Sequence, residues 1–393
     1  FSTPQFLLVD GFETYTDEAG QEIFTAWADG YEDPANGSQV GNDTPPYAER
    51  DIVRSGAQSM PMRYGQGGAT TSEATMTLPG VDWTAGGATT LVLYFRGDPS
   101  NAPAQVYVKI NGTRVDYPGA TASLAAPSWK QWNIDLASLG NAAKNVRTLT
   151  IGVAGSGSGI LHVDDIRLYR DAPPQPAPPV DPGTANLVAL YTMEDSLADG
   201  SGRGYNGTAE VGSSFAAGMP GYGRALVLDG TSGHATLPIG PLVQSLSSAT
   251  FTTWLNWAGS GSQWCRIFDF GTGETVYMFL TPNSGGASLR FAITTGGPGG
   301  ESQLNRAGIL SAGWRHVAVA IDGATMTMQM YLDGEMVASG TTNTLPSALG
   351  NTTQNYLGRS QWADPYLPGS IDDFRIYNRA LAGGEIRYLI GDR

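Results

Sequence analysis

The chain has 393 residues, of which 53 are glycine and 24 are proline, and only 15% are charged. This composition excludes a coiled coil, a collagen and a disordered chain, and the length favours two domains over one hydrophobic core. Lysine and arginine number 22 against 36 aspartates and glutamates, so the formal charge is −14. Because an acidic surface repels phosphate backbones and anionic lipid headgroups, we expect neither a nucleic-acid partner nor insertion into a membrane.

The cysteine content and the start of the chain bear on the compartment. Cys265 is the only cysteine, so the chain forms no internal disulfide. The sequence has no run of 18 or more apolar residues that could span a bilayer. The first residue is Phe1 and not methionine, as a cleaved signal peptide or a shortened chain would leave. We expect a bacterial protein that is secreted or held at the cell surface.

A proline-rich segment divides the chain. Residues 171–184 contain six prolines, which remove backbone hydrogen-bond donors and favour an extended polyproline II spacer. The sequence therefore predicts a first domain at residues 1–170, a linker at 171–184 and a second domain at 185–393.

Both predicted domains show the pattern of antiparallel β-structure. Residues 105–117 contain two short strands around an Asn-Gly turn, and residues 325–338 repeat this design around Asp-Gly. Other short runs of β-branched and aromatic residues are bounded by Gly, Pro, Ser and Asn, and helical periodicity occurs only near 380–389. We predict an all-β fold class, with two antiparallel β-sandwich (jelly-roll) domains joined by the Pro-rich linker.

The two predicted domains end on the same motif. Val-Asp-Asp-Ile-Arg-Leu-Tyr occupies residues 163–169, and Ile-Asp-Asp-Phe-Arg-Ile-Tyr occupies residues 371–377. Strand alternation places Asp164 and Asp372 on the same face as core hydrophobes. Alternatively, a β-bulge at the acid pair turns the second aspartate of each pair inward. In both cases one carboxylate of each pair is partly buried.

A buried carboxylate needs an ionic partner, a metal or a proton, because desolvation of the charge is costly. Arg167 and Arg375 follow the acid pairs but are expected to face outward, so a hard cation such as Ca²⁺ fits better. The alternative is a carboxylate satisfied by other donors at a strand end. A structural calcium ion would tie the opening strand of each domain to its closing strand. Its candidate ligands are Asp10, Glu13, Asp164 and Asp165 in the first domain and Glu194, Asp199 and Asp372 in the second.

A series of motifs in the second half resembles a known family. In chain order the motifs lie at residues 186–194, 200–207, 223–230, 313–319, 331–335 and 369–381. Together they resemble the laminin-G-like, concanavalin A-like jelly-roll modules of bacterial exoproteins, and the resemblance runs through residues 186–393. It implies two facing antiparallel sheets and, frequently, a structural Ca²⁺.

The first half is similar to galactose-binding-like carbohydrate-binding modules at residues 9–15, 55–60, 132–136 and 163–168. The resemblance implies a calcium ion between an acidic residue of the opening strand and the closing aspartate pair, which matches Glu13 and Asp164 or Asp165. Gly11 stands where such modules often have a second aspartate, which removes one ligand. In polysaccharide-degrading bacteria, modules of both kinds commonly flank a catalytic domain.

The sequence lacks the catalytic motifs of enzymes with this kind of fold. Laminarinase-type enzymes on the concanavalin A-like fold carry Glu-x-Asp-x-x-Glu on one strand, and that spacing does not occur. Polysaccharide lyases often use a histidine or tyrosine base. Among the three histidines, His162 and His316 lie in predicted strands and are read as structural, and the sequence assigns no role to His234. We therefore predict no catalytic residue.

Sugar recognition needs aromatic rings against apolar sugar faces and a few polar groups for the hydroxyls. The candidates are loop aromatics and one arginine: Trp27, Tyr31, Tyr64 and Trp129 in the first domain, and Trp264, Arg359, Trp362 and Tyr366 in the second. We predict a non-catalytic protein whose partner is a polysaccharide or other glycan. One alternative is a polysaccharide lyase or glycoside hydrolase with its site on a concave sandwich face. Another is an adhesin or surface-assembly subunit that self-associates through its sheet edges.

Overall fold

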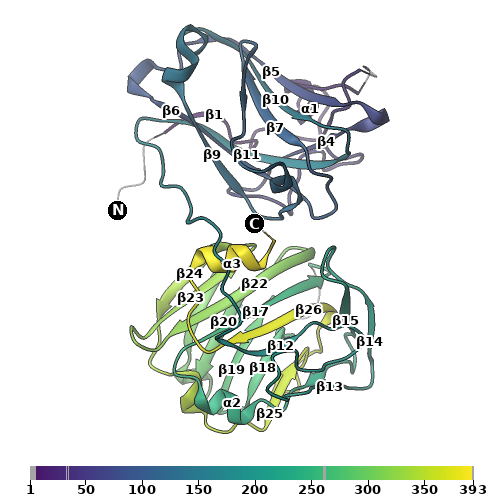
Figure 1. The fold of residues 1–393 in the computed structure, drawn as a ribbon, viewed down its shortest axis with the longest axis vertical. Coiled ribbons are helices and arrows are strands. Elements are labelled where there is room, and N and C mark those ends of the chain that lie inside the picture. The colour runs from purple at the N-terminus through teal and green to yellow at the C-terminus, as the bar shows by residue number, and fades with distance from the viewer. Residues whose placement is uncertain (1–5, 32, 34, 260–262, 392–393) are drawn as a thin grey trace. The chain divides into compact units, whose positions relative to one another are not determined.

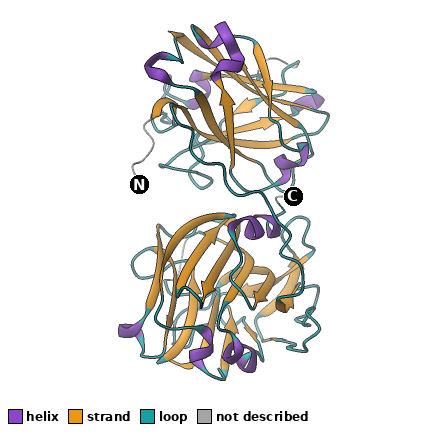
Figure 2. Ribbon diagram, turned by 60° about the vertical axis from the view of Figure 1, so that its left-hand side comes forward, coloured by secondary structure: helices purple, strands orange, loops and turns teal. Residues whose placement is uncertain are grey.

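The computed structural model describes residues 6–31, 33, 35–259 and 263–391. The chain divides into two compact units: the main segment of the first is Phe1–Ala177, and the second is Pro178–Ile390. Strands are the main regular secondary structure of each unit (Figures 1 and 2), so the predicted all-β fold of paired antiparallel sheets is confirmed. Among the helices of the described ranges, none has both the length and the apolar character needed to cross a membrane.

The described residues of the first unit form a six-stranded and a five-stranded sheet. The first sheet runs in the order β3 (Gln39–Val40), β4 (Met60–Tyr64), β11 (Gly159–Tyr169), β6 (Thr90–Arg96) and β9 (Lys130–Asp135), with β1 (Phe6–Asp10) beside β11. The second runs in the order β2 (Trp27–Ala28), β5 (Thr71–Val81), β10 (Val146–Ala154), β7 (Gln105–Ile110) and β8 (Thr113–Asp116). The helical segments are α1 (Ile23–Ala26) and short 3₁₀ turns at Gln66–Gly68, Ala85–Gly87, Thr121–Ala125 and Leu136–Ala143.

The described residues of the second unit form an eight-stranded and a seven-stranded sheet. The first runs in the order β14 (Ser213–Ala217), β15 (Arg224–Asp229), β26 (Pro368–Tyr377), β17 (Ala249–Trp257), β22 (Gly313–Asp322), β23 (Thr327–Leu332) and β24 (Glu335–Thr341), with β12 (Leu187–Tyr191) beside β26. The second runs in the order β13 (Thr208–Ala209), β16 (Ala235–Thr236), β25 (Gln354–Leu357), β18 (Phe268–Gly273), β19 (Val276–Thr281), β20 (Ser288–Thr294) and β21 (Ser302–Ala307). The helical segments are α2 (Gly240–Ser245), α3 (Gly383–Leu389) and 3₁₀ turns at Pro298–Gly300 and Pro346–Leu349.

Each unit has its own hydrophobic core between its two sheets, because alternate side chains of most strands face inward. In the second unit, Phe268 and Phe270 of β18 stack with 4.9 Å between their ring centroids, and both contact Phe374 of β26. Helix α3 contributes Ile386 and Leu389 to a separate cluster with outward-facing residues of the eight-stranded sheet. The helix therefore covers part of the outer face of that sheet.

The two predicted hairpins are present. Asn111 and Gly112 have φ values of 51° and 81° between β7 and β8, and Asp333 and Gly334 have 48° and 83° between β23 and β24. Positive φ at both central residues is the signature of a type I′ turn, which matches the twist of the paired strands. The helical periodicity near residues 380–389 corresponds to α3.

The repeated closing motif adopts the bulged form. The pairing of β11 with β6 shifts register between Asp164 and Arg167, and the pairing of β26 with β17 shifts near Asp372. Asp165 and Asp373 have φ values of 55° and 50°, a left-handed conformation that aspartate tolerates better than most residues. The bulge keeps the flanking apolar residues in the core on both sides of the acids. Regular alternation was thus the wrong alternative, and both aspartates of each pair are buried, not one.

Candidate functional site

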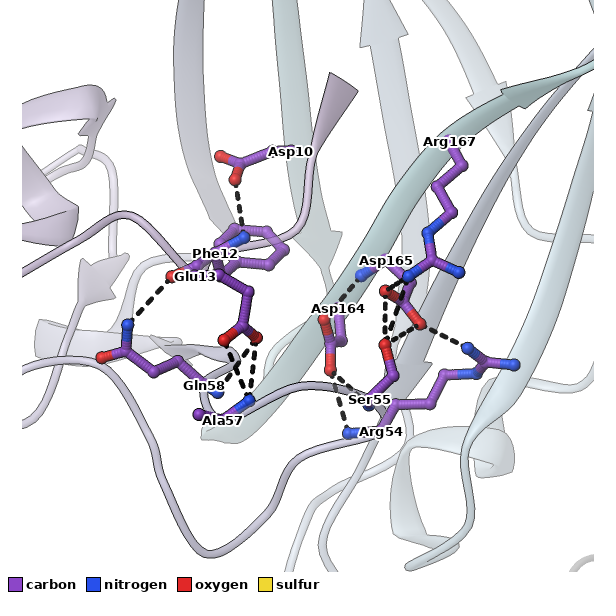
Figure 3. A network of polar contacts seen from close by, with 10 residues as sticks. All are labelled: Asp10, Phe12, Glu13, Arg54, Ser55, Ala57, Gln58, Asp164, Asp165 and Arg167. Atoms are coloured by element: carbon purple, nitrogen blue, oxygen red, sulfur yellow. Dashed lines mark hydrogen bonds and ion pairs between the residues drawn. The ribbon is translucent and has the colours of Figure 1, made fainter. Parts of the chain in front are cut away.

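In the first unit, the second closing aspartate is neutralised by two arginines. Arg54, from the loop before β4, and Arg167 of β11 both form short ion pairs with Asp165 (Figure 3). The Ser55 hydroxyl donates to Oδ1 of Asp165 at 2.8 Å. Arg167 lies between the core residues Ile166 and Leu168, so it faces away from the core as expected, yet it still reaches Asp165. Arg54 and Arg167 therefore provide the ionic partner that a buried carboxylate needs.

The first closing aspartate is held by backbone donors. Asp164 accepts hydrogen bonds from the amides of Arg54, Ser55 and Asp165 at 2.9, 3.2 and 2.7 Å (Figure 3). Burial, with the charge of Asp165 adding to it, raises the pKa of Asp164 to about 7.

The opening acids of the first unit are also satisfied by protein donors. The buried carboxylate of Asp10 accepts from the Phe12 amide at 2.8 Å, the Tyr15 hydroxyl at 2.6 Å and Nε1 of Trp27 at 2.9 Å. Glu13 is exposed and accepts from the Ala57 amide at 2.9 Å. This set of four acids is occupied by guanidinium, hydroxyl and amide donors, so it does not fit the ligand set predicted for a calcium ion in this unit.

The closing acids of the second unit differ. Arg375 lies between the core residues Phe374 and Ile376, so it faces away from the core as expected, and it pairs with Asp373 at 2.8 Å. Oδ2 of Asp372 accepts from the Met219 amide at 3.0 Å. No hydrogen bond to Oδ1 of Asp372 meets the geometric limits among the described residues, although a backbone hydrogen-bond interaction from Asp373 acts to lower the pKa of this aspartate. Burial, with the charges of Asp373 and Glu194 adding to it, raises the pKa of Asp372 to about 7.

Of the other acids predicted as ligands in this unit, only one suits a cation. Glu194 is exposed and accepts one amide hydrogen bond, from Arg224 at 3.1 Å. Asp199 accepts from the amides of Leu190, Ser201 and Tyr205, so it organises a turn and does not fit the predicted role. Within the described ranges, no three His, Cys, Asp or Glu side chains converge as metal ligands. A buried, unpartnered carboxylate oxygen on Asp372 beside Glu194 nevertheless fits a cation, with other oxygens completing its shell.

Three of the four aromatic residues predicted to bind sugar in the first unit are buried. Trp27 is fully buried and its indole N–H donates to Asp10, while Tyr64 is 1% exposed and donates to the Ala102 carbonyl at 3.0 Å. Trp129 is 8% exposed and packs in a cluster with Tyr94 and Tyr169. Their predicted exposure in loops was wrong, because Trp27 lies in β2, Tyr64 lies in β4, and Trp129 packs against neighbouring aromatic side chains.

Tyr31 is the exception. Its side chain is 76% exposed and lines a cleft of about 730 Å³ together with Phe24, Tyr47, Asp29 and Asn42, among others. The Phe24 and Tyr47 rings meet edge to face at 5.2 Å. Aromatic and polar side chains of this kind can hold a small polar ligand.

In the second unit, the outer face of the seven-stranded sheet carries a continuous set of polar and aromatic side chains. Strand pairing aligns Tyr356 of β25 with Asp269 of β18, Asp269 with Phe279 of β19, and Phe279 with Ala292 of β20. Because neighbouring residues of a strand point to opposite faces, this row faces away from the core residues Phe268 and Phe270.

Arg266 lies at the centre of this face and is almost fully buried. Its guanidinium contacts Asp269 at 3.3 Å and Asp364 at 3.0 Å. Three aromatic rings surround it, with centroids 4.1 to 5.6 Å away: Phe279, Trp264 and Trp362. Burial raises the pKa of Asp269 to about 7, and its carboxylate has no exposed surface. The cation–π and ionic contacts hold the two tryptophans in place.

The structure brings together all four sugar-binding candidates of the second unit on this face. Trp362 meets Tyr277 edge to face at 4.7 Å, Trp264 meets Phe279 at 6.4 Å, and both tryptophans are half-buried. Arg359 and Tyr366 form a second group with Tyr356 and His234: the Arg359 guanidinium lies 4.7 Å from the Tyr356 ring and 6.0 Å from the Tyr366 ring, and it approaches Nε2 of His234 at 3.3 Å.

Sequence reasoning missed the residues that organise this face. Arg266 precedes β18 and Tyr356 lies within β25, and neither residue was singled out from the sequence. Alternation would place Arg266 on the same side as the core residue Phe268, so its position on the outer face depends on the loop before β18.

The family model of the concanavalin A-like lectin/glucanases superfamily matches residues 229–387. This match confirms the resemblance carried by the motifs of the second half, and the second unit is a concanavalin A-like sandwich. The match does not extend into the first unit, whose similarity to galactose-binding-like modules stays a prediction. No curated protein matches the sequence.

Several solved structures are similar in fold. Domain 4 of AbnA, an extracellular arabinanase from Geobacillus stearothermophilus solved with arabinotriose, is 23% identical and covers 52% of this chain and 98% of its own, with a TM-score of 0.45. The Ruminococcus gnavus IT-sialidase CBM40, bound to α2,3 sialyllactose, is 14% identical over 42% and 96%, with a TM-score of 0.37. The binding domain of botulinum neurotoxin serotype C1 is 15% identical over 53% of each chain, with a TM-score of 0.42, so this chain spans about half of its length. Such low identities and scores say nothing about a shared ligand.

Proposed function

We propose that this protein is a secreted, non-catalytic polysaccharide-binding protein whose glycan lies on the outer face of the seven-stranded sheet. The observation that carries the proposal is the pair of half-buried tryptophans, Trp264 and Trp362, held around the buried guanidinium of Arg266. Rings fixed in this way present apolar surface with little loss of side-chain entropy, which suits stacking against sugar rings.

Polar groups around the tryptophans supply partners for sugar hydroxyls. Asp364 is half-exposed and accepts from Arg266 and Ser360. Gln303 and Asn305 of β21 are exposed on the same face at its far edge. A surface with apolar rings and fixed acceptors and donors is the usual composition of a glycan site.

The non-catalytic part of the proposal rests on the state of the acids on this face. Asp269, the acid there with a raised pKa, is fully buried against Arg266 and Phe279, so it lacks access to a glycosidic oxygen. The carboxylate of Asp364 is engaged within the protein, because Arg266 pairs with it and the Ser360 hydroxyl donates to it.

A structural calcium ion belongs to this proposal in the second unit only. Asp372 and Glu194 would hold it, because Asp372 has a buried carboxylate oxygen without a hydrogen bond and the charges of the two acids repel each other. The ion would supply positive charge at the junction of the opening and closing strands and would take no part in sugar chemistry.

Affinity electrophoresis of the full chain through gels containing arabinan, xylan, mixed-linkage β-glucan, polygalacturonate or alginate tests the proposal. We expect retardation by at least one polymer, and Trp264→Ala or Trp362→Ala should weaken it by about 10-fold, since each removes a stacking ring. Trp314→Ala is the matched control, because this half-buried tryptophan lies on β22 of the other sheet.

Two outcomes would contradict the proposal. Retardation by no polymer in the panel removes the binding function, and release of new reducing ends or unsaturated products from a bound polymer replaces it with an enzymatic one. Tyr31→Ala, tested in parallel, shows whether the cleft of the first unit contributes a second sugar site.

A further inference from the structure

The proposed glycan face is rich in arginine although the protein carries a formal charge of −14. Arg266, Arg290 and Arg359 all belong to it: Arg266 precedes β18, Arg290 lies in β20 and Arg359 follows β25. The three arginines differ in whether a carboxylate of the protein pairs with them. An arginine without such a partner is available to bind a ligand.

The guanidinium of Arg266 is occupied by partners within the protein. It pairs with Asp269 and Asp364, donates to the Trp264 carbonyl, and is almost fully buried between aromatic rings. Its charge is therefore compensated within the protein, and it serves to position the tryptophans.

Arg359 has no carboxylate partner among the described residues. Its side chain is half-buried on the Tyr356 ring, and its one hydrogen-bond partner is His234, at 3.3 Å between Nη1 and Nε2. Nδ1 of His234 lies 2.9 Å from the Ser232 carbonyl oxygen, so Nδ1 carries the hydrogen and Nε2 accepts from Arg359. A guanidinium has five N–H donors, so most of those on Arg359 remain available on one side of a held, planar group.

Like Arg359, Arg290 is held by a neutral hydrogen-bond partner and an aromatic ring. Its Nε donates to Oδ1 of Asn305 at 2.7 Å, and its guanidinium lies 5.4 Å from the Trp264 ring centroid. No carboxylate in the described ranges pairs with it. Both arginines are thus fixed by neutral partners and aromatic rings, which keeps them in place without neutralising them.

The two uncompensated arginines lie at opposite sides of the face. Strand β25 is separated from β20 by β18 and β19, so three strand spacings, roughly 14 Å, lie between their strands. The tryptophans and the cluster of Arg266, Asp269 and Asp364 occupy the space between. This spacing suits a chain of several sugar units and not one monosaccharide.

We propose that the glycan recognised by this face is acidic, and that its carboxylate or sulfate groups pair with Arg359 and Arg290 while its rings stack on Trp264 and Trp362. The inference rests on the function proposed above and adds the class of ligand. Arginine is suited to this role because its planar fork binds carboxylates and sulfates through two parallel hydrogen bonds.

The test compares charged and uncharged forms of the same polymer. The full chain is run by affinity electrophoresis against polygalacturonate and alginate, each beside its carboxyl-reduced form, and against κ-carrageenan beside its desulfated form. We expect one acidic polymer to bind at least 10-fold more tightly than its uncharged counterpart, and added NaCl to weaken that binding. The polymer that shows the difference distinguishes carboxylate from sulfate recognition.

Variants connect the effect to the two arginines. Arg359→Gln and Arg290→Gln should each weaken binding of the acidic polymer by about 10-fold or more and leave the uncharged form little changed, because a charge-assisted hydrogen bond is lost. Arg147→Gln is the matched control: it removes the same charge from an exposed position on β10 of the first unit.

Each contrary result has one meaning. Equal binding of charged and uncharged forms, or binding of neutral polymers alone, overturns the acidic-glycan inference and leaves the proposed function standing. An equal loss for both forms in Arg359→Gln also overturns it, because that pattern indicates a packing role. If no charged or neutral polymer binds, the proposed function itself fails.

Discussion

The closing edges of the two units carry the same motif but compensate its acids in different ways. In the first unit, Arg54 and Arg167 neutralise Asp165, and three amides satisfy Asp164. In the second, Arg375 alone pairs with Asp373, and one oxygen of Asp372 has no hydrogen bond among the described residues. The difference comes from the loop that passes each acid pair. In the first unit this loop supplies the Arg54 side chain and the amides of Arg54 and Ser55, whereas in the second unit it supplies the amide of Met219.

The backbone around these acids is nevertheless built alike. Phe12 and Met193 have φ values of 62° and 60°, and each precedes an exposed glutamate, Glu13 or Glu194. Each glutamate then accepts from an amide that follows a glycine of positive φ, namely Ala57 after Gly56 and Arg224 after Gly223. A Cβ at those glycines would lie 2.2 and 1.9 Å from Oε1 of the glutamates, so only glycine permits the approach. The two units therefore share this glutamate–glycine backbone arrangement, although they differ in how the charges of their closing aspartates are compensated.

The largest expected effect concerns the second aspartate of each pair. Asp165→Asn should lower the free energy of unfolding by about 3 kcal/mol, because it leaves Arg54 and Arg167 without a counter-charge. Asp373→Asn should cost less, about 2 kcal/mol, because one arginine loses its partner. Asparagine keeps the left-handed conformation, so the change tests charge and not backbone. Urea denaturation measures the free energy of unfolding of both variants. An equal loss in the two variants would contradict the proposed difference between the closing edges.

The next effect concerns the first aspartate and depends on pH. The pKa of Asp372 is raised to about 7 by burial, so its protonated form stabilises the fold at low pH, and this stability is lost as the pH rises from about 4 through about 7. With a chelator present, Asp372→Asn should remove that loss and raise stability by about 2 kcal/mol at pH 8. Scanning calorimetry across this pH range measures the change.

Asp164→Asn is the matched variant for that experiment. The pKa of Asp164 is also raised to about 7, but its carboxylate accepts three amides, and an asparagine amide would face the Asp165 N–H, which donates at 2.7 Å. We expect this variant to lose stability where Asp372→Asn gains it. Added Ca²⁺ should raise the melting temperature of the wild type and of Asp164→Asn but not of Asp372→Asn. A calcium response retained in Asp372→Asn would place the ion elsewhere.

The smallest effect concerns the exposed glutamates. Glu13→Gln and Glu194→Gln should each cost about 0.5 to 1 kcal/mol in chelator, since an exposed carboxylate that accepts amides contributes little more than a neutral acceptor. With Ca²⁺ present, the cost of Glu194→Gln should rise and that of Glu13→Gln should not. Equal responses of the two variants to calcium would show that the closing edges do not differ in ion binding.

Sequence patterns predicted the strand hairpins and the concanavalin A-like fold, and they indicated acids at both closing edges. Sequence patterns also selected Trp264, Trp362, Arg359 and Tyr366 as candidate sugar-binding residues, because these residues lie in Gly-rich or polar loops. The same reasoning failed for Trp27, Tyr64 and Trp129 in the first unit, which are buried. A polar or glycine-rich surrounding does not exclude a strand, as Trp27 in β2 and Tyr64 in β4 show, and it does not tell whether a loop residue such as Trp129 is covered by other side chains.

What the sequence by itself determined is the order of strands, turns and repeated motifs, since period-2 alternation and Asn-Gly or Asp-Gly turns are local. Only the tertiary structure decided which charges meet. Arg54 reaches Asp165 across more than a hundred residues, and Arg266 meets Asp364 through a loop that returns to the sheet. Such contacts depend on distances in space between residues far apart in the chain. Local patterns could therefore not give the ion partners of the closing acids or the arginine pattern of the proposed glycan face.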